Sequence, residues 1–64
     1  MLEHDLLNIL NSEDSTNFHS QLMRLFFKAD IHNFALLRKG FPNTARLVEH
    51  YKKTGEVLTG LEYE

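Results

Sequence analysis

Residues 17–53 read NFHSQLMRLFFKADIHNFALLRKGFPNTARLVEHYKK, and apolar side chains recur along this stretch at helical spacing. A helix is predicted over about residues 17–29, with either Ser15 or Thr16 as its N-cap. One face of this helix collects five apolar residues, Phe18, Leu22, Leu25, Phe26 and Ala29. That sector is wider than one neighbouring helix usually covers, so we expect this helix to be central in the fold.

A second helix is predicted over residues 31–39, with Asp30 as its N-cap. Its inward face is expected to carry Ile31, Phe34, Ala35 and Leu37. Because only Asp30 separates Ala29 from Ile31, two arrangements stay open. Either two helices meet at a break at Asp30, which we favour, or one kinked helix runs through.

A third helix is predicted over residues 42–53, since Pro42 suits the first turn of a helix. Gly40 is expected to end the preceding helix in the left-handed conformation, and Gly55 to end this one in the same way. The apolar face of the third helix consists of Ala45, Leu47, Val48 and Tyr51.

Beyond this stretch, an amphipathic helix is predicted over residues 2–11 and an apolar tail over residues 55–64. The tail contains Val57, Leu58, Leu61 and Tyr63, and it either packs back over the helices or contacts a partner. Residues 1–64 are therefore expected to form a single all-α domain. This domain would be a compact bundle of three to four short helices, at about residues 2–11, 17–29, 31–39 and 42–53.

The composition is that of a folded protein, with 42% hydrophobic and 25% charged residues in a chain of 64. A core of this size is only marginally self-sufficient, and the absence of cysteine excludes a disulfide framework or a thiolate metal site. No apolar run is long enough for a membrane span, and no signal peptide is visible. We therefore expect a cytoplasmic location.

The net charge of −2 conceals a strong asymmetry along the chain. Residues 1–23 carry a net charge of −4, residues 24–53 carry +5 and residues 54–64 carry −3. This pattern indicates a basic binding surface, acidic ends that lie against a basic middle, or simply solvated helix faces.

Catalytic and metal-binding patterns are not found in the sequence. The four histidines, His4, His19, His32 and His50, fall one in each predicted helix, and no two share the spacing that places metal ligands on one face. No serine lies in a nucleophile elbow, and the three glycines form no phosphate-binding loop. We expect no enzyme activity and no cofactor, and a histidine metal site assembled from separate helices is the weakest hypothesis.

The seven aromatic residues and many leucines exceed what so short a chain can enclose, and exposed apolar surface usually marks association. We therefore expect a homodimer or higher oligomer, or a complex with another protein. The predicted interface residues lie at the margins of the helical stripes or in the tail: Leu7, Met23, Phe27, Leu58, Leu61 and Tyr63.

An alternative function is nucleic-acid binding by the basic middle of the chain. Two helices joined through Gly40, Phe41 and Pro42 would form a loose helix–turn–helix, and the sequence offers five candidate contacts: Arg38, Lys39, Arg46, Lys52 and Lys53. The pI of about 6.0 is far below that of most nucleic-acid-binding domains, so this alternative ranks second.

Roughly half of the chain resembles small uncharacterised proteins encoded by bacteriophages, prophages and related mobile elements. The resemblance lies in Phe18-x3-Leu22-x2-Leu25-x2-Lys28-Ala29-Asp30, then Asn33-Phe34-x2-Leu37-Arg38-Lys39-Gly40-Phe41-Pro42, and then Val48-x2-Tyr51. These motifs carry no assigned chemistry. What the resemblance implies is a phage-type accessory protein in the host cytoplasm, acting by binding a host or phage protein and in some cases inhibiting a bacterial defence protein.

Overall fold

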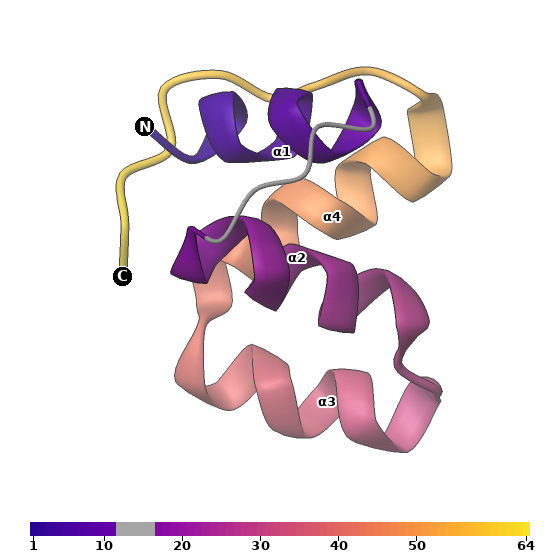
Figure 1. Cartoon of the computed structure of the whole chain (residues 1–64). Coiled ribbons are helices and arrows are strands. Elements are labelled where there is room, and N and C mark those ends of the chain that lie inside the picture. Colours follow the sequence, from indigo (N-terminus) through magenta and orange to yellow (C-terminus); the bar gives the residue numbers. More distant parts are fainter. Residues whose placement is uncertain (12–16) are drawn as a thin grey trace.

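The computed structural model describes residues 1–11 and 17–64, which form four helices followed by an extended tail (Figure 1). The helices are α1 (Leu2–Leu10), α2 (Phe18–Lys28), α3 (Ile31–Gly40) and α4 (Pro42–Thr54). No strand occurs within these two ranges. The predicted all-α bundle of short helices is confirmed.

Side-chain caps fix where two of the helices begin. Asn17 caps α2 by accepting a hydrogen bond from the backbone N–H of Ser20 at 3.1 Å. Asp30 caps α3 by accepting one from the N–H of Asn33 at 2.7 Å, as its sequence position predicted. The chain therefore breaks between α2 and α3, and they are two helices. Ser15 or Thr16 was predicted as the cap of α2; both lie outside the described residues, and the cap is Asn17.

The ends of α3 and α4 depend on different residues. Gly55 ends α4 in the left-handed conformation with φ 77°, as predicted. The prediction for Gly40 is wrong, because this residue is the last helical residue of α3 and its φ is not positive. Phe41 ends α3 instead, at φ −135° and ψ 68°, since Pro42 disfavours helical geometry at the residue before it. Pro42 then begins α4, as predicted.

The helices pack as two pairs joined by α4. Helix α1 packs against α2 and α3 packs against α4, while α4 also contacts α1 and α2. Helices α2 and α3 run antiparallel to each other (Figure 1). Their buried aromatic rings, Phe26 of α2 and Phe34 of α3, meet edge to face with centroids 5.1 Å apart.

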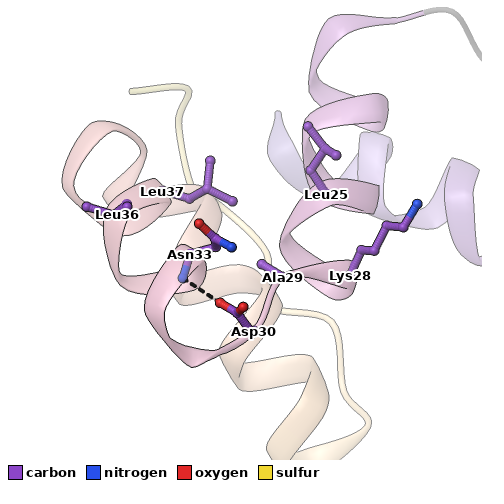
Figure 2. A pocket seen from close by; sticks show the side chains of 7 residues that line it. All are labelled: Leu25, Lys28, Ala29, Asp30, Asn33, Leu36 and Leu37. Carbon is purple, nitrogen blue, oxygen red and sulfur yellow. Dashed lines mark hydrogen bonds between the residues drawn. The ribbon is translucent and has the colours of Figure 1, made fainter.

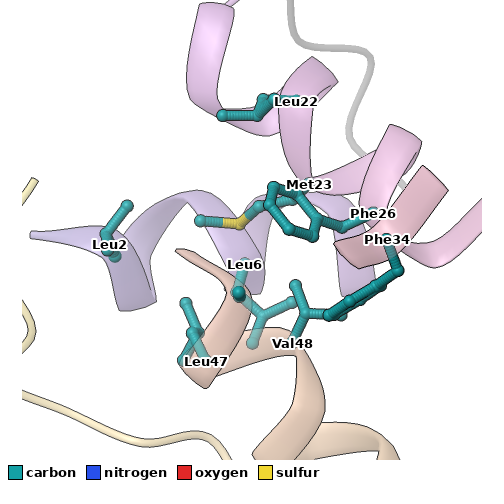
Figure 3. Packing of buried hydrophobic residues seen from close by; sticks show 9 residues of the cluster. Leu2, Leu6, Leu22, Met23, Phe26, Phe34, Leu47 and Val48 are labelled. Atoms are coloured by element: carbon teal, nitrogen blue, oxygen red, sulfur yellow. The ribbon is translucent and has the colours of Figure 1, made fainter. Parts of the chain in front are cut away.

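The core is a single cluster to which every helix contributes (Figure 3). Helix α3 contributes only Phe34 to it, because α4 is the main neighbour of α3. The nine buried apolar residues are Leu2, Leu6, Leu22, Met23, Phe26, Phe34, Ala45, Leu47 and Val48.

The buried face of α2 is not the one that the sequence pattern predicted. Leu22 and Phe26 are buried as expected, but Phe18 and Leu25 are 63% and 55% exposed, and Met23 is buried in their place. Helices α1 and α4 pack against α2 and cover Met23, while the edge of α2 that carries Phe18 and Leu25 stays exposed. Half of the wide apolar sector therefore remains at the surface.

The predicted inward face of α3 also needs correction. Ile31 is 92% exposed at the start of the helix, and Ala35 and Leu37 are only half-buried. Phe34 alone is buried, so α3 is the least enclosed of the four helices.

The tail over residues 55–64 runs back across α1 toward the start of α4 (Figure 1). Val57, Leu58 and Leu61 are partly buried against the core. The N–H of Leu2 donates to the carbonyl oxygen of Leu61 at 3.3 Å, and the N–H of Gly60 donates to Glu3 Oε1 at 3.2 Å. These two hydrogen bonds thus hold the tail against the first turn of α1.

The side chain of Glu64 completes the start of α4. Phe41, the residue before this helix, supplies no side-chain cap. The Glu64 carboxylate accepts hydrogen bonds from the N–H of Asn43 at 3.1 Å, the N–H of Thr44 at 2.8 Å and the Thr44 hydroxyl at 2.6 Å. Because the first N–H groups of a helix have no partner within it, a negative charge there stabilises the helix.

Candidate functional site

A groove lies between α2 and α3, with a cavity volume of about 530 Å³ (Figure 2). Figure 2 shows Leu25 on one side of the groove and Asn33 and Leu37 on the other. Its lining residues are Leu25, Lys28, Ala29, Asp30, Asn33, Leu36 and Leu37. Most of these are apolar, and they come from the two sides that helix packing leaves open.

The leucines of the groove are accessible to a partner. Leu25 is 55% exposed and Leu36 is 51% exposed, while Ala29 and Leu37 are half-buried. The core formed by the described residues encloses nine apolar side chains and leaves these leucines in water, at a cost in free energy. Contiguous apolar surface of this kind usually marks a binding site.

The apolar surface continues toward the junction of α3 and α4. Phe18 lies seven residues before Leu25, so both side chains fall on the same edge of α2. The Phe18 ring lies 6.2 Å from the ring of the half-buried Phe41, centroid to centroid. We call this surface, made of Phe18, Leu25, Ala29, Leu36, Leu37 and Phe41, the α2–α3 face.

The polar groups of the groove support its shape. Asp30 Oδ1 accepts a hydrogen bond from the backbone N–H of Asn33, so this carboxylate of the groove is engaged as the cap of α3 (Figure 2). Lys28 is exposed at the end of α2. Among the described residues, the lining contains no histidine, serine or threonine, and its chemistry is suited to apolar contact and charge pairing.

The six predicted interface residues do not gather on this face. Met23 is buried in the core, so its prediction as a surface contact is wrong. The physical reason is that α1 and α4 cover the side of α2 on which it lies. Leu7 is exposed, but it lies on α1.

The other four predicted interface residues make contacts within the chain. Phe27 is half-buried and its ring lies edge to face against Tyr51 at 6.0 Å. Leu58 and Leu61 are partly buried against the core. Tyr63 is partly exposed, with its ring 4.3 Å from that of His19.

Two of the five candidate nucleic-acid contacts are engaged within the fold. Arg38 forms an ion pair with Glu49, and its guanidinium lies 5.3 Å from the centroid of the Phe34 ring. The Lys52 ammonium lies 5.8 Å from the ring centroid of Phe27 and 5.3 Å from that of Phe34. Both cations therefore cover aromatic rings at the edge of the core.

The other three candidates are exposed. Lys39 is near the end of α3, while Arg46 and Lys53 line a shallow hollow on α4 together with His50. Nucleic-acid binding by these residues stays a prediction, which a mobility-shift assay at low salt tests.

A metal centre requires several histidine, cysteine or carboxylate side chains that converge on one point. Within residues 1–11 and 17–64, no three such side chains could hold a metal ion together. No helix in the same ranges is long and apolar enough to cross a membrane.

A hydrogen bond between the tail and α1 raises the pKa of a tyrosine. The Tyr63 hydroxyl donates to Oδ2 of the buried Asp5 at 2.7 Å. This hydrogen bond, burial, and the negative charges of Asp5 and Glu3 raise the pKa of Tyr63 above 10.0.

The free energy of unfolding should therefore depend on pH through Tyr63. Because its pKa is higher in the folded chain, its contribution is complete below about pH 10 and is lost as the pH rises through the folded value. We expect the stability advantage of the native chain over Tyr63→Phe to shrink as the pH rises above about 10. Urea unfolding followed by circular dichroism measures this, and a constant difference would contradict it.

Comparison of the chain with protein-family models, with curated proteins and with solved structures found no match. The candidate site therefore rests on the geometry of the α2–α3 face. The sequence patterns assigned Phe18 and Leu25 to the core and did not single out Leu36. The signal that could have found Phe18 and Leu25 was the width of the apolar sector of α2, which exceeds what one neighbouring helix covers.

Proposed function

We propose that this chain is a small protein-binding module that holds a helical segment of another protein on the α2–α3 face. The observation that supports the proposal is the groove of about 530 Å³ with two half-exposed leucines on its opposite helices. An amphipathic helix that lays its apolar side into such a groove is a recurring mode of recognition. Binding would bury the apolar surface that the bundle leaves in water.

The resemblance of residues 18–51 to small phage and prophage proteins supplies a biological context for this proposal. In that context the partner is a host or phage protein, and binding modulates or inhibits it in the cytoplasm of the host. Nothing in this proposal requires a cofactor or a catalytic group.

The experiment that tests the proposal measures the affinity of an amphipathic helical peptide with uncharged flanks and leucines at i, i+3, i+4 and i+7. The double variant Leu25→Gln/Leu36→Gln should weaken binding at least about tenfold, because burying a leucine contributes roughly 1.5–3 kcal/mol. Glutamine keeps the helix propensity of leucine, so the fold should be retained.

The matched control is Leu7→Gln, which removes an exposed leucine from α1 instead. This variant should bind the peptide as the native chain does. Equal affinity of the double variant and the native chain would overturn the proposal.

A further inference from the structure

The α2–α3 face lies on a part of the bundle that carries a net positive charge. Residues 18–40, which form α2, α3 and the turn between them, carry four basic residues against one acidic residue, a net charge of +3. The whole chain has a net charge of −2. The apolar groove thus lies in a positively charged region of a molecule whose net charge is negative.

Two lysines are placed to act on a ligand in the groove. Lys28 lies three residues after Leu25 on α2, and Lys39 lies three residues after Leu36 on α3, so each shares a helix face with a groove leucine. Both side chains are exposed, and both lie at the ends of their helices. Helices α2 and α3 run antiparallel (Figure 1). Each lysine lies in the last turn of its own helix, so the two lysines lie at opposite ends of this helix pair.

The other charged groups of this region are already engaged. The Asp30 carboxylate holds the first turn of α3, where the helix dipole compensates its charge. Arg38 is paired with Glu49 of α4. The charge that the groove presents to a ligand is therefore positive at both ends.

A second copy of this chain is a poor match for the face. Two copies meeting through it would bring one +3 region against another, and like charges across an interface cost free energy. A partner with negative charge on both sides of its apolar stripe gains from the same lysines.

We infer that the ligand of the α2–α3 face is an amphipathic helix of about three turns, with apolar anchors in the groove and acidic residues at both ends of its apolar stripe. The length follows from α3, whose ten residues extend about 15 Å. This inference rests on the proposed function, and it specifies the chemical class of the partner.

The test uses three synthetic helical peptides with the same leucines at i, i+3, i+4 and i+7 and with glutamate, glutamine or lysine on the flanks. We expect the glutamate peptide to bind at least about tenfold more tightly than the lysine peptide at low salt. The difference in affinity between these two peptides should become smaller as the salt concentration rises, because salt screens the charges. Isothermal titration calorimetry gives the affinities, and methyl chemical shifts locate the site.

A double variant tests whether Lys28 and Lys39 cause the preference for the glutamate peptide. Lys28→Gln/Lys39→Gln should lower the affinity for the glutamate peptide to that for the glutamine peptide and leave the latter unchanged. Lys53→Gln, which removes an exposed lysine from α4, is the matched control and should change neither affinity.

Each result decides between the inference and the proposed function. Equal affinities, or tightest binding of the lysine peptide, overturn the acidic partner and leave the proposed function standing. If no peptide shifts the methyl groups of Leu25, Leu36 and Leu37, both are overturned. If the chain alone dimerises in sedimentation experiments and Leu25→Gln dissociates the dimer, the occupant is a second copy and the acidic helix is excluded.

Discussion

Replacing Phe26 with alanine should lower the free energy of unfolding by about 3–5 kcal/mol. The Phe26 side chain is 0% exposed, and its ring packs edge to face on Phe34, the only buried residue of α3. Alanine would leave a cavity where α2, α3 and α4 meet and would remove this ring contact. A domain of this size has a total stability of roughly 3–10 kcal/mol, so the variant should lose most of it.

Urea unfolding followed by circular dichroism measures this loss. The matched control is Leu25→Ala, at the neighbouring position, where the side chain is 55% exposed. Its cost should be about 1 kcal/mol or less, because the substitution leaves no enclosed cavity. Similar losses for both variants would mean that the buried face of α2 is not the one described.

Replacing Glu64 with alanine should cost about 1–2 kcal/mol. The reason is that its carboxylate supplies the cap that Phe41 cannot, through three hydrogen bonds with the first turn of α4. Without it, the N–H groups of Asn43 and Thr44 lose their partner and the positive end of the helix dipole loses a negative charge. The tail would keep its hydrogen bond from the Asn43 side-chain amide to the Glu62 carbonyl oxygen.

Glu62→Ala is the control for Glu64→Ala, because it removes the same charge from the same tail. Only the backbone carbonyl of Glu62 is engaged, by the Asn43 side-chain amide at 3.0 Å, and alanine keeps that carbonyl. We therefore expect Glu62→Ala to leave the free energy of unfolding unchanged. Equal losses for the two variants would show that net charge, and not the cap, sets the effect.

Capping and turn residues in the sequence were sufficient to predict several of the helix boundaries. Asp30, Pro42 and Gly55 act on residues within one helical turn of themselves, so their roles as cap, first residue and left-handed end were confirmed. Gly40 failed as a cap because Pro42, two residues later, already ends α3 at Phe41.

The candidate site depends on contacts between distant residues and was harder to predict. Periodicity identifies the apolar residues of α2, but which of them are covered depends on where α1 and α4 pack. Met23, which was predicted to lie at the surface, is therefore in the core, and Leu25, which was predicted to lie in the core, is exposed. Glu64 was also missed as a cap, since it lies twenty residues from Thr44.

The position of a bound peptide tests the role of the α2–α3 face most directly. Nuclear Overhauser effects between the glutamate-flanked peptide and the protein's methyl groups report contacts atom by atom. We expect them at Leu25, Leu36 and Leu37, on both sides of the groove. Nuclear Overhauser effects confined to Leu7, Leu58 and Leu61 would place the bound peptide on α1 and the tail. That result would contradict the role of the groove in binding.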